Sequence, residues 1–325
     1  MVIRQLISRY KQFGGLKVVR IYAKMGILWP MVKTIACNPF SRHSYKKAYY
    51  KAIGKIEPFL RVQYSPVMYD RNEYYSSLVL EHHRRKTIWF CWLQGLDHAP
   101  SIVKVCYESL RKYLPDREII VIDSNNWRGY IDLPDYILQR WENKQIPSAH
   151  FTDLIRLQLL IQYGGTWIDS TILCTGFDTP TTRGTLDYLD TDLFLFQYTR
   201  PGSNLWGGIG NWFITSCTNN DVLLVLRDML FAYWKDYDCT LDYFIFHLFF
   251  SMLKDVYPEQ IASMPYGYAS NSSILGYNRG TRFDQTKWNS LVSKVSFHKL
   301  TYNVGGKVLK DQDNYYNYII GLYEV

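Results

Sequence analysis

The segment between residues 87 and 122 constrains the fold most, because it contains two strand-like runs separated by a helix. Residues 87–92 form a short apolar run, and residues 100–113 place apolar side chains at helical spacing. A second apolar run follows at residues 118–122. The order strand, helix, strand indicates a parallel βαβ unit and therefore an α/β protein. Asp123 directly follows the second run, at the edge of the sheet where ligands of open α/β proteins bind.

A second informative stretch begins at residue 148. Residues 148–163 carry apolar side chains at helical spacing, which predicts a helix. Gly164 and Gly165 end it, because glycine readily adopts the positive φ favoured at a helix C-terminus. A short strand then ends in Asp169. Further along, the pattern predicts two strands and two helices, at residues 193–197, 211–215, 221–235 and 240–254.

Three charged residues of this stretch are candidates for chemistry. Asp153 and Arg156 are three positions apart and share one helix face. By itself this spacing is that of an ordinary surface ion pair, worth well under about 1 kcal/mol. Asp169, at a strand end after the Gly-Gly turn, is placed to face a cleft. Its carboxylate suits Mg²⁺ or Mn²⁺ on a substrate diphosphate, because hard divalent cations prefer oxygen ligands.

The pattern D-x-x-R, seven residues, then G-G-x-x-x-D runs from Asp153 to Asp169. It resembles the signature of the DxD sugar-binding glycosyltransferases. These include yeast mannosyltransferases, bacterial capsular polysaccharide synthesis proteins and, more distantly, the glucosyltransferase domains of large clostridial toxins. The capsular polysaccharide synthesis group is the most similar. The matching blocks are residues 89–95, 99–100, 121–126, 153–171, 211–214, 241–244 and 298–302.

The resemblance implies a GT-A fold, which is a Rossmann-like nucleotide-sugar-binding sheet flanked by helices. It implies that Trp92, on the first strand, stacks on the nucleotide base. The alternative for Trp92 is plain core packing. It further implies that Asp153 and Arg156 bind donor-sugar hydroxyls, a task that suits a planar guanidinium. Asp169 matches the first carboxylate of the DxD motif, which contacts ribose and metal. Asp123 completes the expected donor-binding set.

The sequence departs from the motif at its third position, which is Thr171 instead of an aspartate. A threonine hydroxyl is a weaker, neutral metal ligand, so this departure puts metal dependence in doubt. His298 is expected to compensate as a metal ligand, which gives a metal set of Asp169, Thr171 and His298. Lys299 is expected to neutralise diphosphate charge. The alternative for His298 is a structural histidine.

Two further residues are candidates on the acceptor side. Asp242 could orient the donor sugar or an acceptor hydroxyl, or it could cap the predicted helix at whose start it lies. Asn211, after a glycine-rich loop, could contact substrate or simply form a turn.

The resemblance predicts transfer of a sugar from a nucleoside diphosphate sugar, by default a UDP-sugar, to a glycan hydroxyl. The expected setting is capsular or exopolysaccharide synthesis, with retention of anomeric configuration and with Mn²⁺ or Mg²⁺. The expected acceptor is a lipid-linked or polymeric glycan. Two alternatives remain open: a phosphotransferase that moves a sugar phosphate, and a non-catalytic nucleotide- or glycan-binding protein.

Charge divides the chain into two expected parts, a basic segment at residues 1–56 and a main domain at residues 57–325. The first part holds twelve basic and no acidic residues, whereas the remainder holds 25 basic and 29 acidic. Basic residues interleave with apolar ones over residues 1–30, as in a helix that lies on an anionic membrane. The alternatives are a basic helix packed on the protein body and, less favoured, nucleic-acid binding. We expect no nucleic-acid partner, because no nucleic-acid-binding module is recognisable.

The expected location is the cytoplasm, peripherally at the inner face of the cell membrane. No run of about 18 apolar residues predicts a spanning helix, and no secretory signal is recognisable. The six scattered cysteines form no CxxC pair and are typical of reduced, buried thiols.

Overall fold

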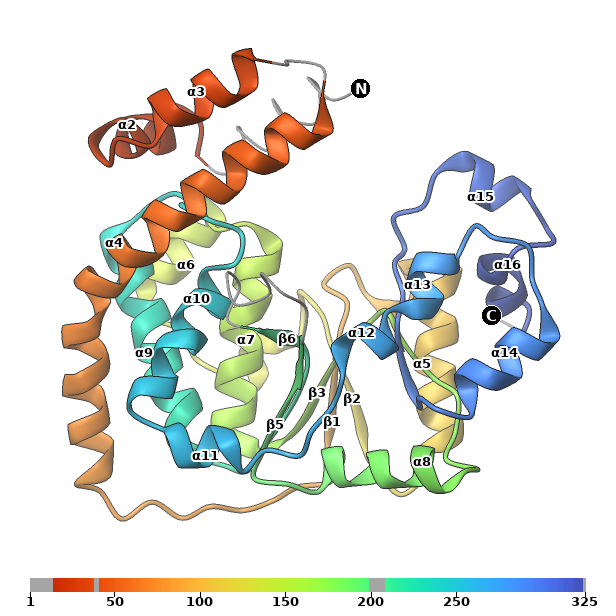
Figure 1. Cartoon of the computed structure of the whole chain (residues 1–325). Helices are drawn as coiled ribbons and strands as arrows, with labels where there is room; N and C mark the ends of the chain where they lie inside the picture. The colour runs from red at the N-terminus through yellow and green to blue at the C-terminus, as the bar shows by residue number, and fades with distance from the viewer. Residues whose placement is uncertain (1–13, 38–40, 199–207, 324–325) are drawn as a thin grey trace.

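The fold is organised around a five-stranded mixed sheet with helices on both faces (Figure 1). The computed structural model describes residues 14–37, 41–198 and 208–323. The strand order is β2-β1-β3-β6-β5; β1 pairs in parallel with β2 and β3, whereas β6 is antiparallel to β3 and β5. These strands are β1 (Ile88–Cys91), β2 (Ile119–Ile122), β3 (Gly165–Asp169), β5 (Leu193–Gln197) and β6 (Ile209–Ser216). The predicted α/β class, with a parallel-containing sheet flanked by helices, is confirmed.

Apolar side chains of the strands alternate between two separate cores. Trp89 and Trp167 belong to one buried cluster, and Phe90 and Ile168 to the other. Successive strand residues point to opposite faces, so a strand covered on both faces must be apolar throughout. This covering explains the continuous apolar run at the first strand.

Helices gather in two groups, one on each face of the sheet (Figure 1). The first group packs against the Trp89 face and comprises α4 (Arg42–Ser76), α6 (Asp135–Glu142), α7 (Ser148–Tyr163), α9 (Asp221–Asp236), α10 (Ile245–Met252) and α11 (Pro258–Ala262). On the other side lie α5 (Ser101–Tyr113), α8 (Pro180–Arg183), α12 (Ala269–Ser272), α13 (Ile274–Asn278), α14 (Gln285–Val292), α15 (Gly306–Lys310) and α16 (Tyr315–Ile320). A small second sheet pairs β4 (Ile172–Cys174) with β7 (Phe297–Lys299).

The helix predicted at residues 240–254 starts later than expected, at Ile245. The carboxylate of Asp242 accepts a hydrogen bond of 2.7 Å from the backbone N–H of Phe244. This local bond holds the preceding residues in a turn, as short polar side chains often do. The helix predicted at residues 148–163 is confirmed with the same bounds.

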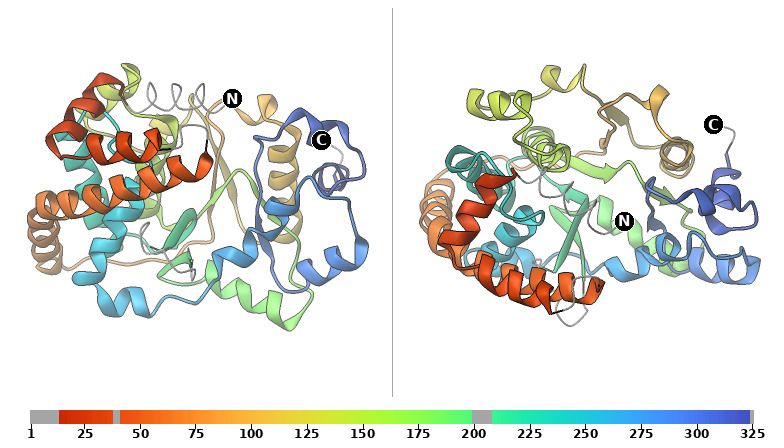
Figure 2. Two further views of the ribbon diagram at one scale, coloured as in Figure 1. Left: turned by 45° about the horizontal axis from the view of Figure 1, so that its top comes forward. Right: turned by 90° about the horizontal axis from the view of Figure 1, so that it is seen from above.

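Two further helices, α2 (Leu16–Lys24) and α3 (Leu28–Ala36), precede α4 and form a layer with its first half (Figure 2). Val18 and Ile27 are buried in the same core cluster as Ile56 and the body of the protein. The boundary expected at residue 56 lies inside α4, a continuous helix of 35 residues. The described part of the basic segment is therefore packed against the main domain through buried apolar residues such as Val18 and Ile27. Within the described ranges, no helix combines the length and hydropathy that a membrane span requires.

The turn between α7 and β3 depends on glycine. Gly164 and Gly165 have φ of 67° and 93°, a region that other residues rarely adopt. A Cβ on Gly165 would lie 2.4 Å from the carbonyl oxygen of Thr87. The close approach lets the N–H of Thr166 donate a 2.8 Å hydrogen bond to that same carbonyl. The glycine pair thus places β3, and Asp169 at its end, beside β1.

Gly165→Ala should therefore destabilise the protein by more than about 1 kcal/mol, through strain at positive φ and the clash with Thr87. Urea unfolding of the variant and the wild type measures the difference. Gly184→Ala is the matched control, because Gly184 has φ of −62° and no neighbouring atom within 4 Å of an added Cβ. Equal losses in the two variants would contradict this role for Gly165.

Candidate functional site

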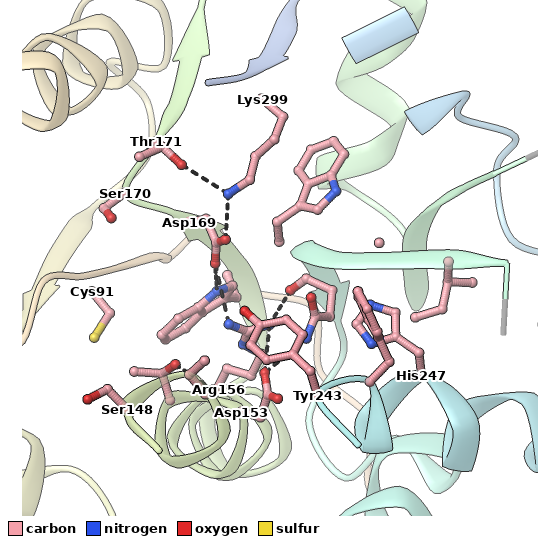
Figure 3. A pocket seen from close by; sticks show the side chains of 18 of the residues that line it. Cys91, Ser148, Asp153, Arg156, Asp169, Ser170, Thr171, Tyr243, His247 and Lys299 are labelled. Carbon is pink, nitrogen blue, oxygen red and sulfur yellow. Dashed lines mark hydrogen bonds and ion pairs between the residues drawn. The ribbon is translucent and has the colours of Figure 1, made fainter. Parts of the chain in front are cut away.

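A pocket of about 1000 Å³ opens at the carboxyl ends of β1 and β3. Asp169, the last residue of β3, lies beside Cys91, the last residue of β1, in the parallel register. Ligands of α/β sheets bind at this edge. Within the pocket, α7 supplies Asp153 and Arg156, and β7 supplies Lys299 (Figure 3).

Arg156 contacts two carboxylates of the pocket, those of Asp153 and Asp169. Its Nη1 lies 3.1 Å from Asp153 Oδ1 and donates a hydrogen bond to the backbone carbonyl of Asn211, and its Nη2 lies 3.4 Å from Asp169 Oδ1. The guanidinium stacks over the ring of Trp167 at 4.8 Å. Arg156 is only 5% exposed, so it positions the two carboxylates more than it presents itself to a ligand.

Asp169 is tied to a second cation, Lys299. The ammonium Nζ donates a 2.7 Å hydrogen bond to Asp169 Oδ2 and a 2.9 Å hydrogen bond to Thr171 Oγ1 (Figure 3). The other carboxylate oxygen of Asp169 accepts a 3.0 Å hydrogen bond from Trp167 Nε1. Lys299, Thr171 and Asp169 therefore form one bonded group at the pocket floor.

The two carboxylates differ in their acidity. Burial raises the pKa of Asp153 to about 7, against the opposing effect of Arg156. Burial also acts to raise the pKa of Asp169, but the charges of Lys299 and Arg156 outweigh it and hold that pKa below its usual value. Asp169 is the permanent anion of the site, whereas Asp153 can exchange a proton near neutral pH.

Asn211 joins the group from β6. Its side-chain Nδ2 donates a 2.9 Å hydrogen bond to Asp153 Oδ1, so it orients that carboxylate. Asn211 lines the pocket, and its contact with a substrate stays a prediction.

Aromatic and histidine side chains form other parts of the wall. Trp92 lines the pocket, and its ring meets Tyr302 edge-on at 5.1 Å between centroids. Tyr243, in the turn before α10, and His247, on α10, also line it (Figure 3). Burial lowers the pKa of His247 to about 3, so this imidazole is neutral at physiological pH. Trp92 thus lies at the pocket, and its stacking on a nucleotide base stays a prediction.

Lys46 and Tyr50, on the first half of α4, also line the pocket. They lie in the basic segment, far in sequence from the D-x-x-R motif. No local signal identifies them; only the packing of α4 against the body brings them to the site.

Three predicted residues are not brought into this pocket. The Oδ1 of Asp123 accepts hydrogen bonds of 2.7 and 3.0 Å from the backbone N–H groups of Asn125 and Asn126, which form a turn. Asp242 is 1% exposed and holds the turn before α10. His298 is 1% exposed, and its Nε2 lies 3.1 Å from Thr175 Oγ1.

The position of His298 corrects the expected metal set. Lys299 faces the pocket, and its strand neighbour therefore points to the opposite side. Within the part of the chain that the structure describes, no group of three or more His, Cys, Asp or Glu side chains is arranged to hold a metal ion. Asp169 and Thr171 are close, but the ammonium of Lys299 already bonds both. The residues present thus do not fit the expected Mn²⁺ or Mg²⁺ site.

The fold and the pocket define an α/β protein with a large pocket at the carboxyl ends of its parallel strands. The chain matches the family model described as capsular polysaccharide synthesis protein over residues 40–319, and it belongs to that family. The comparison with curated proteins finds no match. Among solved structures, the chain is similar to one titled PaToxG Glycosyltransferase. The identity is 14%, the match covers 82% of this chain and 97% of that chain, and the TM-score is 0.38.

The buried carboxyl of Asp242 should make stability depend on pH. Burial raises its pKa from 3.8 to about 6. A group whose pKa is raised on folding stabilises the folded state fully below its unfolded pKa, and this contribution is lost as pH rises through the folded pKa. Between pH 4 and 8, the wild type should lose up to about 3 kcal/mol relative to Asp242→Asn, whose amide oxygen still accepts from Phe244.

Urea unfolding of both proteins across this pH range measures the difference. Parallel pH profiles would contradict the raised pKa. A folded but inactive Asp242→Asn protein would instead support the substrate-orienting role that the sequence predicts for Asp242.

Proposed function

We propose that this protein is a glycosyltransferase that moves a sugar from a nucleoside diphosphate sugar to a glycan hydroxyl in capsular polysaccharide synthesis. Membership of the capsular polysaccharide synthesis family supports this role. The observation that carries the proposal is the bonded group of Asp169, Arg156 and Lys299 at the floor of a pocket of about 1000 Å³. This volume is at the upper end of the ~300–1000 Å³ typical of ligand pockets, large enough for a nucleotide sugar.

The chemistry of the wall suggests how a donor would lie. Trp92 offers an aromatic face for the base, with a UDP-sugar as the default donor. Lys299 offers a cation for the diphosphate. Asp153, oriented by Asn211, offers a hydrogen-bonding carboxyl group for donor-sugar hydroxyls. Arg156 holds the carboxylates of Asp153 and Asp169 in place.

For the reaction we propose retention by front-face attack. Asp153 is buried and bonded to Asn211 and Arg156, and Asp169 is bonded to Lys299, so neither is arranged as a free nucleophile. In a front-face reaction the bond between the anomeric carbon and the diphosphate oxygen breaks, and a bond to the acceptor oxygen forms on the same face. The acceptor proton passes to the departing diphosphate. The site's contribution is orientation together with charge stabilisation of the leaving group.

The test is a donor screen with UDP-, GDP- and dTDP-sugars that measures nucleotide release. We expect UDP release from one UDP-sugar, and a loss of at least about 100-fold in Asp169→Asn, because Lys299 and Arg156 then lose their common anion. Asp123→Asn is the matched control, since Asp123 lies outside the pocket, and it should retain wild-type turnover.

Unchanged turnover in Asp169→Asn would overturn the assignment of the site. Release of the nucleoside monophosphate instead of the diphosphate would identify a sugar-phosphate transferase. Binding of UDP without any turnover, with lipid-linked acceptors present, would favour a binding protein.

We propose further that the basic segment holds the enzyme on an anionic membrane, where a lipid-linked glycan acceptor would be met. Residues 1–13 of the predicted membrane-contacting segment lie outside the described residues. Within the described part, Trp29 and Val32 on α3 are 75% and 53% exposed, and Lys33 follows them on the same helix. Exposed apolar side chains next to basic ones are the arrangement that interfacial helices use.

Replacing both Trp29 and Val32 with glutamate should weaken binding to vesicles containing anionic lipid by about tenfold or more, since it removes apolar contact and adds repulsion. Vesicle co-sedimentation measures the effect. Val79→Glu is the control, because Val79 is fully exposed but lies in the loop after α4, at the other end of that helix. Equal vesicle binding by all three proteins would refute membrane contact through α3. Deletion of residues 1–30 is a poorer test, because it also removes Val18 and Ile27 from the core.

A further inference from the structure

We propose that the ammonium of Lys299 takes the place of a divalent cation in this site, so that the protein binds a nucleoside diphosphate without metal. This inference rests on the proposed function, since it concerns how the donor's diphosphate is held. It also departs from the metal dependence that the sequence resemblance implies.

The backbone fixes where the ammonium lies. Lys299 pairs with Ile172 in the antiparallel register of β7 and β4. The next residue, Leu300, donates its N–H to the carbonyl of Thr171 at 2.8 Å. These two backbone contacts hold Lys299 directly beside the D-x-T segment. Its side chain then reaches Asp169 Oδ2 and Thr171 Oγ1. These two residues occupy the first and third positions of the DxD motif, which the resemblance implies as metal ligands.

The oxygen atoms of Asp169 are already engaged. Its Oδ1 accepts from Trp167 Nε1 at 3.0 Å and lies 3.4 Å from Arg156 Nη2, while its Oδ2 accepts from Lys299 at 2.7 Å. A divalent ion on Oδ2 would have to displace Lys299 or share the oxygen with it at the cost of like-charge repulsion. Mg²⁺ is normally held by one or two carboxylates together with substrate phosphates. Here a neutral hydroxyl stands where the second carboxylate would be.

The ammonium of Lys299 has a hydrogen-bond donor and a charge to offer to a diphosphate. A lysine carries three N–H donors, and Asp169 and Thr171 use two of them. The Lys299 side chain is 27% exposed and lines the pocket, so the third donor is available to a phosphate oxygen. Lys299 has one carboxylate partner, Asp169, and shares it with Arg156, so the charge of the ammonium is only partly neutralised and suits an anion.

The experiment is calorimetric titration of the full chain with UDP, GDP and dTDP, in EDTA and again in Mn²⁺. For the nucleotide that binds best, we expect dissociation constants in the two buffers that agree within about twofold. Lys299→Met should weaken diphosphate binding at least about tenfold in EDTA, whereas the corresponding nucleoside should bind the variant and the wild type alike. The nucleoside control shows that the pocket is still folded. Lys299→Arg keeps the charge and should retain most of the affinity.

Three outcomes would overturn the inference. Wild-type binding that falls tenfold or more in EDTA and returns with Mn²⁺ would show a metal site, while leaving the proposed glycosyltransferase function intact. Unchanged diphosphate affinity in Lys299→Met would show that the ammonium does not hold the phosphates. Absence of binding by all three nucleotides in both buffers would instead refute the nucleotide-sugar site, and this inference with it.

Discussion

The ion-pair group centred on Arg156 is the interaction on which the site depends. A guanidinium that is 5% exposed is strongly destabilising unless its lost hydration is replaced by close partners. Asp153 and Asp169 supply the opposite charge, the carbonyl of Asn211 supplies a further acceptor, and Trp167 supplies an aromatic face. Removing any one charged partner would leave another charge buried without compensation. The group therefore forms as a unit, and its members come from α7, β3 and β6.

Because β6 is distant in sequence from α7 and β3, this requirement constrains the tertiary structure as well as the chemistry. The Gly164-Gly165 turn brings β3 back along α7, and its close contact with Thr87 sets the position of β3 beside β1. Lys299 then reaches the same carboxylate from β7, near the end of the chain. The cation on each side of Asp169 explains why its carboxyl is more acidic than usual despite its partial burial. The neighbouring Asp153, which is more deeply buried, is less acidic than usual.

Local sequence signals predicted the elements that carry the motif. The helical spacing at residues 148–163, the two glycines and the short strand to Asp169 all depend on nearby residues, and the structure confirms each of them. Features that depend on packing were harder to predict. The site contribution of Lys46 and Tyr50 arises only when α4 packs on the body. Asp242 looked like a residue inside a helix, but its side-chain bond to Phe244 delays the helix start.

His298 and Lys299 are a second case in which the sequence alone could not predict which side chain reaches the site. Both were placed near the site, but side chains of adjacent strand residues point to opposite faces, so only one of the two can enter the pocket. The resemblance could not decide which one, because the register of β7 against β4 decides it, and that register is a long-range property. Once Lys299 occupies the pocket, Thr171 becomes understandable as well. A carboxylate at position 171 would neutralise the ammonium completely, whereas the hydroxyl of threonine orients it and leaves its charge available to an anionic ligand. Threonine at the third motif position and lysine on β7 are therefore best regarded as one physical arrangement.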